Sequence, residues 1–364
     1  MSQRIRLCCV LGTFLLAAGA YTSTRNTVVA TINVGVTPDG LAITPDSRYA
    51  YVVNNNNYGI VNQDSVTVLN LKNNTVKTTI HDDSFVEPFR VAISPDGEKA
   101  YVANSDSTTL SIIDTTLNVV TGVIDGFDGP SGIAITPDGE FAYVNNFGGS
   151  EGVGSGNGTT VSVVNLTTDT IVDTIRVGLA PQALAVSPNG KFVYVINYVD
   201  GQPGTGTMSI INTRTNRVVD TIAGFFGPFD IAVTPNGHYA YVTNFGSNDF
   251  APFGTTVSVV HLRHDPEIVA TVDVGIQPSG VAVSPNGRFA YVTNYNTLYA
   301  GANFTKLTAG QGTVNIIDTH TNEVLPPTIA VGLSTNQVKV SPNGDFAYVT
   351  NFTSNTVNVI CLRK

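Results

Sequence analysis

Apolar and polar residues alternate along most of the chain with a period of two, which is the period of a half-buried β-strand. One stretch shows the unit clearly: apolar residues 281–283 precede Ser284-Pro285-Asn286-Gly287, and an apolar run at 289–292 follows. Proline presets the φ angle of a turn, and Asn and Gly accept positive φ, so the stretch predicts two strands joined by a tight turn. This hairpin occurs seven times, with its turn at residues 44–47, 94–97, 136–139, 187–190, 234–237, 284–287 and 341–344.

Each hairpin is followed by two further strand patterns. After the fifth turn and its strand, residues 256–260 alternate in polarity, a turn spans 263–266, and residues 267–272 have a strand pattern again. Successive hairpin turns are 50, 42, 51, 47, 50 and 57 residues apart. A four-stranded unit at this period is typical of a propeller blade, so the fold class predicted is an all-β, seven-bladed β-propeller.

The two ends of the chain complement each other. The last unit has strand patterns at 338–340, 346–351 and 356–362 but no outer strand, whereas residues 27–34 have the outer-strand pattern of 267–274. We therefore expect strand 27–34 to complete the last blade and close the ring, which removes exposed sheet edges. The predicted blades span about residues 36–80, 85–126, 127–177, 178–224, 225–274, 275–331 and 332–362 with 27–34.

Residues 1–20 have the pattern of a secretory signal peptide. Arg4 and Arg6 precede an apolar run at 7–18, and Ala18-Gly19-Ala20 fits a cleavage site. The alternative is an uncleaved membrane anchor, although the run is short for a bilayer span. Cleavage leaves residues 21–364 as one propeller domain without a membrane span. Cys361 is then its one cysteine, so we expect no internal disulfide and no cysteine-ligated metal.

The charge of the chain disfavours one class of partner. The formal net charge is −9, and it becomes −11 when the two arginines of the leader are removed. The remaining basic residues are scattered. An acidic surface repels phosphate backbones, so single-stranded nucleic-acid binding ranks last among the functions considered.

The Ser/Thr-Pro-Asn-Gly turn followed by Ala-Tyr-Val-Thr-Asn, at residues 240–244, 290–294 and 347–351, resembles the YVTN β-propeller repeat. The resemblance covers essentially everything after the leader. That family includes archaeal surface-layer proteins and bacterial secreted or periplasmic proteins, and related seven-bladed propellers include lactonases and redox enzymes with copper or quinone cofactors. The resemblance thus implies a secreted, periplasmic or cell-surface scaffold but no single activity, and no catalytic residue is carried over.

Every hairpin keeps a tyrosine in its second strand and an asparagine three residues later. A ligand site needs asymmetry, so we interpret a seven-fold repetition as structural. We expect the tyrosines to pack between blades, and the asparagines to bond nearby backbone or to adopt a left-handed conformation. These residues are Tyr51, Tyr101, Tyr143, Tyr194, Tyr241, Tyr291 and Tyr348, with Asn54, Asn104, Asn146, Asn197, Asn244, Asn294 and Asn351.

Function is expected where the repeats differ. In antiparallel blades the Pro-Asn-Gly turns share one face, here called the turn face, and the crossovers and the second-to-third-strand loops share the other, the loop-rich face. The loops on the loop-rich face are longer at 55–64, 147–158, 198–206, 245–254 and 295–311 than in blades 2 and 7, and loops on a rigid scaffold often bind partners. Their aromatic side chains either bind a protein or glycan or pack the loops together. The aromatic candidates chosen from these loops and crossovers are Phe229, Phe250, Phe253, Tyr295, Tyr299 and Phe304.

A second group of candidates lies where the crossovers reach the central channel. The residue at this position is small in four blades, at Gly40, Gly132, Ala183 and Gly280. Three blades break this pattern. We interpret these exceptions and three neighbours as a polar binding site, with a structural ion pair or a solvated mouth as the alternative. The candidates are Arg90, Asp230 and Gln337, with Gln182, Asn336 and Asp39 beside them.

Catalytic constellations are not evident in the sequence. Of the five histidines only His81 is expected on the loop-rich face, which argues against a multi-histidine copper site and against a Ser-His-Asp triad. No Asp-x-Asp-x-Asp run suggests a calcium loop. We therefore predict no catalytic residue, no metal and no cofactor.

The preferred hypothesis is a secreted or surface-exposed, monomeric, non-catalytic scaffold that binds a protein or glycan at a cell surface or in a matrix through its loop-rich face. The alternative is a lactonase- or lyase-like enzyme that uses Arg90 and Asp230 at the channel mouth.

Overall fold

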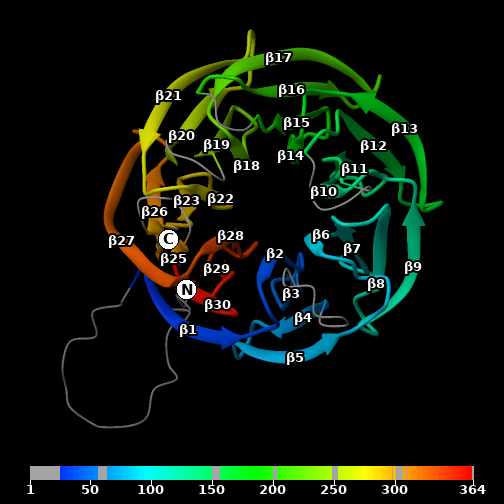
Figure 1. The fold of residues 1–364 in the computed structure, drawn as a ribbon, viewed down its shortest axis with the longest axis horizontal. Coiled ribbons are helices and arrows are strands. Elements are labelled where there is room, and N and C mark those ends of the chain that lie inside the picture. The colour runs from blue at the N-terminus through cyan, green and yellow to red at the C-terminus, as the bar shows by residue number, and fades with distance from the viewer. Residues whose placement is uncertain are drawn as a thin grey trace, which may run out of the picture.

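The computed structural model describes residues 25–55, 64–149, 156–199, 203–247, 253–296 and 310–362, and the backbone of 298–300 and 306–308. The predicted leader and the candidates Phe250 and Phe304 lie outside these residues, as does the side chain of Tyr299. The described residues form strands and no helix, and hence include no helix able to span a membrane. Seven four-stranded antiparallel sheets surround a central channel (Figure 1), which confirms the predicted seven-bladed propeller.

The strands of each blade run in order from the channel to the rim. Blade 1 contains β2 (Pro38–Ile43), β3 (Tyr49–Asn54), β4 (Ser65–Asn70) and β5 (Thr75–Ile80). Blade 2 contains β6 (Pro88–Ile93), β7 (Lys99–Asn104), β8 (Thr109–Asp114) and β9 (Val119–Asp125). Blade 3 contains β10 (Pro130–Ile135), β11 (Phe141–Asn146), β12 (Thr160–Asn165) and β13 (Thr170–Arg176). Blade 4 contains β14 (Pro181–Val186), β15 (Phe192–Asn197), β16 (Gly206–Asn212) and β17 (Arg217–Phe225).

The last three blades follow the same plan. Blade 5 contains β18 (Pro228–Val233), β19 (Tyr239–Gly246), β20 (Phe253–His261) and β21 (Glu267–Asp273). Blade 6 contains β22 (Pro278–Val283), β23 (Phe289–Asn294), β26 (Gln311–Asp318) and β27 (Glu323–Leu333). Blade 7 contains β28 (Thr335–Val340), β29 (Phe346–Asn351), β30 (Thr356–Cys361) and, as its outer strand, β1 (Thr27–Asn33).

The N-terminal strand closes the ring as predicted. β1 pairs antiparallel with β30, with Ile32 opposite Val357 and Thr27 opposite Cys361. The two ends of the chain therefore belong to one sheet, and the last blade has the same four strands as the others (Figure 1).

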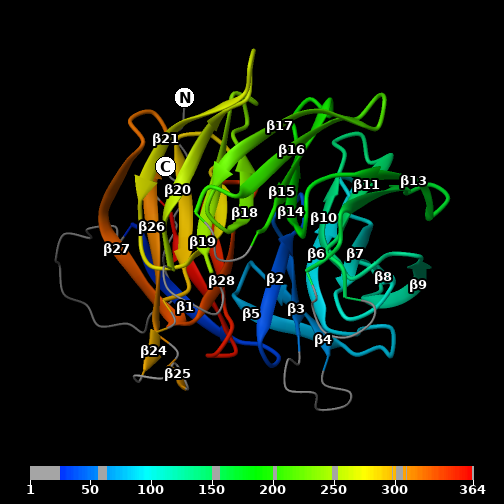
Figure 2. The same ribbon diagram turned by 45° about the horizontal axis from the view of Figure 1, so that its top comes forward.

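The longest loop of blade 6 differs from its prediction. Within the predicted loop 295–311, β24 (Leu298–Ala300) pairs antiparallel with β25 (Lys306–Thr308) as a separate two-stranded sheet. This hairpin projects away from the ring on the loop-rich face (Figure 2). Each strand has only three residues, which is too short to give an alternating pattern in the sequence.

The hydrophobic core lies between neighbouring blades. One cluster joins Tyr241 of blade 5 to Val281, Val292 and Ile317 of blade 6, and six similar clusters complete the ring. The repeated tyrosines are buried in these clusters, and several of their hydroxyls reach a turn residue of the next blade. Tyr51 donates to Asn118 Oδ1 at 2.8 Å, and Tyr241 to Asn322 Oδ1 at 2.8 Å. The predicted interblade role of the tyrosines is therefore confirmed at these positions.

Two tyrosines allow this role to be tested with a matched pair of substitutions. Tyr241→Phe removes the bond to Asn322 and should destabilise the protein by about 1 kcal/mol. Tyr291→Phe removes a buried hydroxyl that has no hydrogen-bond partner, so this change should be neutral or stabilising. Urea denaturation of both variants measures the difference. Equal losses in the two would contradict the assigned role of the hydroxyl.

The repeated asparagines are structural, and some bond nearby backbone as predicted, as from Asn104 Nδ2 to the Thr109 carbonyl at 3.3 Å. Their side-chain amides donate mainly to side-chain oxygens of the adjacent third strand, as from Asn197 to Ser209 Oγ at 3.0 Å and from Asn351 to Asn358 Oδ1 at 2.9 Å. None of the seven has a positive φ, so the left-handed alternative was wrong. The reason is that each asparagine remains in its strand, where it faces the start of the third strand.

Candidate functional site

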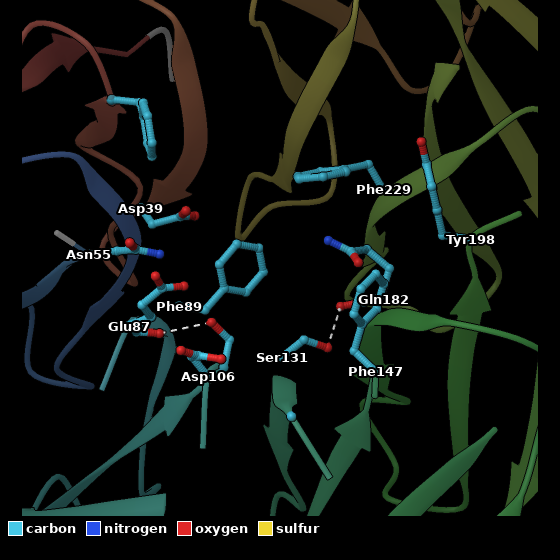
Figure 3. A pocket seen from close by; sticks show the side chains of 13 residues that line it. Asp39, Asn55, Glu87, Phe89, Asp106, Ser131, Phe147, Gln182, Tyr198 and Phe229 are labelled. Atoms are coloured by element: carbon cyan, nitrogen blue, oxygen red, sulfur yellow. Dashed lines mark hydrogen bonds between the residues drawn. The ribbon is translucent and has the colours of Figure 1, made fainter. Parts of the chain in front are cut away.

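The inner strands converge on the loop-rich face, where the central channel opens into a cavity of about 370 Å³, here called the mouth cavity (Figure 3). Five of its lining residues occupy the second position of successive inner strands: Asp39, Phe89, Ser131, Gln182 and Phe229. The crossovers and the second-to-third-strand loops contribute Asn55, Glu87, Ser105, Asp106, Gly129, Phe147, Tyr198 and Phe352.

A β-bulge explains why these positions face the channel. In every blade the register of the inner strand shifts after its first residue, as between Pro38 and Leu41 and between Pro228 and Ile231. A bulge leaves a residue unpaired and changes the direction of the side chains around it. The second residue of each inner strand is thus free to differ between blades without disturbing the core clusters, which are built from later residues such as Ala183 and Val281.

Acidic and amide groups form one wall of the mouth cavity. Asp39, Asn55, Glu87 and Asp106 lie on the side that faces Gln182 and Phe147, with Phe89 between the two sides (Figure 3). Burial raises the pKa of the Glu87 carboxyl, and the negative charges of Asp106 and Asp64 raise it further. The carboxylates of Asp106 and Asp64 therefore make the surroundings of Glu87 electronegative.

Asn55 adds an unsatisfied acceptor to the acidic wall. The residue is only 6% exposed, and its Oδ1 is a buried atom with no hydrogen-bond partner. A buried polar atom without a partner costs free energy, and such atoms are rare in folded proteins. Asn55 therefore places an unpartnered side-chain amide in the wall of the cavity.

Aromatic rings form much of the remaining wall. Phe229 stacks on Phe245 at 5.0 Å between ring centroids, and edge contacts continue from Phe245 to Tyr295 and from Tyr295 to Phe352 at 6.2 and 6.4 Å. Tyr198 donates its hydroxyl to the Gly246 carbonyl at 3.1 Å. The packing interpretation is confirmed for Phe85, Phe127 and Phe225 of the crossovers, which are buried in the core clusters. For the rings that line the cavity, binding stays a prediction.

A buried ion pair lies behind the acidic wall. Arg90 Nη1 donates to Asp39 Oδ1, which also accepts a bond from Asn336 Nδ2 at 2.7 Å. The Arg90 guanidinium lies 4.3 Å from the ring centroid of Phe89 and 5.9 Å from that of Phe229. Burial raises the pKa of Asp39 to about 6, and the charge of Arg90 opposes this rise.

The two other exceptions in the inner-strand pattern join neighbouring blades. Asp230 Oδ2 accepts the backbone N–H of Val281 in the next blade at 3.1 Å, and Gln337 Oε1 accepts that of Leu41 at 2.6 Å. All three exceptions are buried and bonded within the protein. Of the predicted polar candidates, Gln182 and Asp39 are among the residues lining the mouth cavity.

The structure places only some of the predicted aromatic candidates at the mouth cavity. Phe229 lines the mouth cavity, and Tyr295 belongs to the aromatic chain beside it. Phe253 pairs with Gly246 at the start of β20, where it is partly buried. The cavity instead uses residues that were not chosen, notably Asn55, Asp106 and Phe352. Asp106 and Phe352 come from the two short loops of blades 2 and 7. The lengths of the loops could have predicted this, because a short loop between longer ones leaves a hollow on the face.

A lysine in the inner strand of blade 7 was also missed. The fifth residue of the inner strand is alanine in six blades, at Ala42, Ala92, Ala134, Ala185, Ala232 and Ala282, but Lys339 in blade 7. Burial lowers the pKa of the Lys339 amine, the charge of Asp230 opposes this, and the like charge of Arg90 adds to it. Aligning the seven inner strands would have revealed this lysine.

Replacing this lysine by the alanine of the other blades should stabilise the protein. The pKa of the amine is lower in the folded chain than in the unfolded one, so its charge opposes folding at neutral pH and this penalty fades as pH rises through the folded pKa. Lys339→Ala should therefore add about 1 kcal/mol at pH 7 and less at pH 10, whereas the exposed Lys191→Ala should change little. Thermal denaturation at both pH values measures this, and destabilisation by Lys339→Ala at pH 7 would contradict it.

The turn face has a cavity of about 400 Å³ between blades 1 and 2. Its lining combines residues of the repeated turns, such as Thr44, Asp46 and Asp96, with the charged side chains of Arg48 and Lys77, and it includes few aromatic rings. The described residues also contain no group of three or more His, Cys, Asp or Glu placed to hold a metal ion. The mouth cavity is therefore the best candidate site, and its groups can accept hydrogen bonds, attract positive charge and stack on apolar surfaces.

Comparison with known proteins supports the architecture. The chain is similar in fold to a chain of Kuenenia stuttgartiensis hydrazine synthase. The TM-score is 0.74 at 22% sequence identity, and the match covers 94% of this chain and 99% of the other. Identity this low shows the propeller fold alone. No protein-family model matches the sequence, and no curated protein matches it either.

Proposed function

We propose that this protein is a non-catalytic binding scaffold that engages a partner through the mouth cavity on its loop-rich face. The observation that carries the proposal is the cavity itself, about 370 Å³ in volume, lined by aromatic rings and hydrogen-bond acceptors that differ from blade to blade. Ligand sites are typically concave, mainly apolar and equipped with a few placed polar groups, and this cavity meets each condition.

The proposed place of action is outside the cytoplasm, and the proposed partner is a protein or glycan at a cell surface or in a matrix. The signal-peptide pattern of residues 1–20 and the resemblance of the repeat to YVTN propellers support this location. Aromatic faces suit both partners, since they stack on sugar rings and on apolar side chains.

The enzyme alternative loses its proposed catalytic pair. Arg90 is bound to Asp39, and both carboxylate oxygens of Asp230 accept backbone N–H groups, from Ile231 and Val281. A general acid or base must reach the reacting group of a substrate, and neither residue lines the mouth cavity. We therefore do not propose this activity.

The test is a binding screen with residues 21–364 on glycan and peptide arrays, followed by variants. Phe147→Ala combined with Phe352→Ala should weaken binding of any hit at least tenfold, because aromatic anchors dominate binding energy. The matched control is Tyr239→Ala, which removes a 36% exposed ring from the turn face and should leave binding unchanged. Loss of binding in the control alone, or in neither variant, would overturn the proposal.

A further inference from the structure

Hydrogen-bond acceptors dominate the polar lining of the mouth cavity. Glu87 and Asp106 contribute carboxylates, Asp39 lies beside them, and none of the described lining residues is Lys, Arg or His. Asp39 is neutralised by Arg90, whereas Glu87 is surrounded by the further negative charges of Asp64 and Asp106. A positively charged ligand in this cavity would therefore reduce the repulsion among the carboxylates of Glu87, Asp106 and Asp64.

A second, independent observation points to a donor on the ligand. The buried Oδ1 of Asn55 has no hydrogen-bond partner and lies in the same wall of the cavity (Figure 3). Rotation of this amide turns Oδ1 toward the cavity, where a ligand N–H group placed between Asn55 and Glu87 would satisfy it and meet a carboxylate at once.

The aromatic lining restricts the kind of cation. Phe89 already carries the Arg90 guanidinium over its ring, which shows that the ring system of the mouth accommodates a cation in this orientation. Cation–π contacts favour ammonium and guanidinium groups, whereas divalent metal ions need several oxygen ligands. The described residues offer no cluster of metal-binding side chains.

We infer that the mouth cavity binds an organic cation with N–H donors, an alkylammonium or guanidinium group on an apolar stem. The charged head lies at Asn55, Glu87 and Asp106, and the stem lies against Phe147 and Phe352. This inference rests on the proposed function, since it names the ligand class of the same cavity.

The direct test compares 4-phenylbutylammonium with 4-phenylbutanol, two probes of similar shape of which one is neutral. Titration calorimetry on residues 21–364 at pH 7.5 and low salt should give at least tenfold tighter binding of the ammonium probe. Glu87→Gln combined with Asp106→Asn should remove this preference. The control, Glu98→Gln combined with Glu140→Gln, changes the net charge equally on the turn face and should retain it.

The same titration has a pH dependence with a definite sign. The pKa of Glu87 is raised and that of Asp39 is about 6, so both carboxyls take up protons as pH falls, while the ammonium probe stays charged. Affinity for the ammonium probe should therefore fall several-fold from pH 7.5 to pH 5. Affinity for the alcohol should not change, and a parallel fall for both probes would contradict the assigned role of the carboxylates.

Two natural sources of such a group can be separated with a second pair of ligands. A lysine-containing peptide with its ends blocked represents a partner protein, and a glucosamine tetramer represents an amino-sugar polymer. The matched neutral ligands are the same peptide with acetylated lysine and the N-acetylglucosamine tetramer. Preference for either charged form supports the inference and identifies the source, whereas preference for the neutral forms overturns it.

Failure of this inference can be told from failure of the proposed function. Equal affinity for the two phenylbutyl probes overturns the cation inference. The scaffold proposal survives that result if Phe147→Ala with Phe352→Ala still abolishes binding of an array hit, and it fails if these substitutions have no effect.

Discussion

A chain that lacks β1 should fail to form a stable ring. We expect deletion of residues 1–34 to lower the free energy of unfolding by about 5 kcal/mol or more, which is a large share of the stability of a typical domain. β1 is the outer strand of blade 7, and its removal exposes the edge of β30 along six residue pairs. An unpaired edge also promotes association with other chains. Urea denaturation and light scattering measure both effects.

Single substitutions in β1 and a shorter deletion distinguish the loss of packing from the effect of shortening the chain. Ile32 is 6% exposed and packs with Leu41, Val52 and Val357, so Ile32→Ala should cost about 2–4 kcal/mol. Val29 in the same strand is 40% exposed, and Val29→Ala should cost less than about 0.5 kcal/mol. Deletion of residues 1–24 alone should leave stability unchanged. A fully stable chain without β1 would contradict closure of the ring by this strand.

Breaking the buried ion pair should have the second largest effect. Arg90→Ala leaves the Asp39 carboxylate buried with Asn336 as its remaining side-chain donor, and we expect a loss of about 3–5 kcal/mol at pH 8. Removing one partner of a buried pair is costly because the other charge stays in a poorly solvated place.

The loss should depend on pH with a definite sign. The pKa of Asp39 is about 6 in the folded protein against an ordinary value of 3.8, so the group favours folding below about pH 4 and this contribution is lost as pH rises through 6. Removing Arg90 takes away the charge that lowers the pKa of Asp39, so the pKa should rise further. The destabilisation caused by Arg90→Ala should therefore be smaller at pH 5 than at pH 8.

Other blades supply the control for this experiment. Blade 3 has Ser131 where blade 1 has Asp39, and blade 4 has Ala183 where blade 2 has Arg90. Asp39→Ser combined with Arg90→Ala removes both charges and should recover at least half of the stability lost in the single variant, because both variants share the space left by the guanidinium. A double variant no more stable than Arg90→Ala would contradict a cost that arises from an unpaired charge.

Much of the fold follows from the sequence because its signals are local and repeated. A turn such as Ser284–Gly287 specifies one hairpin, and seven copies specify the ring. Closure of the ring could be predicted because residues 27–34 have an outer-strand pattern and the C-terminal unit of the sequence has only three strand patterns. The bonds of the repeated asparagines were not predictable in detail, since their partners depend on the register between the second and third strands.

The site was predicted less well than the fold, for a geometric reason. The sequence predicts a site on the loop-rich face and at the channel mouth, but it favours the long loops as the binding elements. The cavity instead includes Asp106 and Phe352 from short loops. Burial and hydrogen-bond partners decide whether a polar residue lines the cavity, as Gln182 does, or bonds a neighbouring blade, as Gln337 does. Neither property is visible in the residue type.

The most direct measurement of the central claim is a crystal structure of residues 21–364 soaked with 4-phenylbutylammonium. We expect its electron density in the mouth cavity, with the nitrogen within hydrogen-bond distance of Asn55 Oδ1 or of the Glu87 or Asp106 carboxylate and the phenyl ring against Phe147 or Phe352. An empty mouth cavity at saturating probe, or density confined to the turn face, would contradict the account.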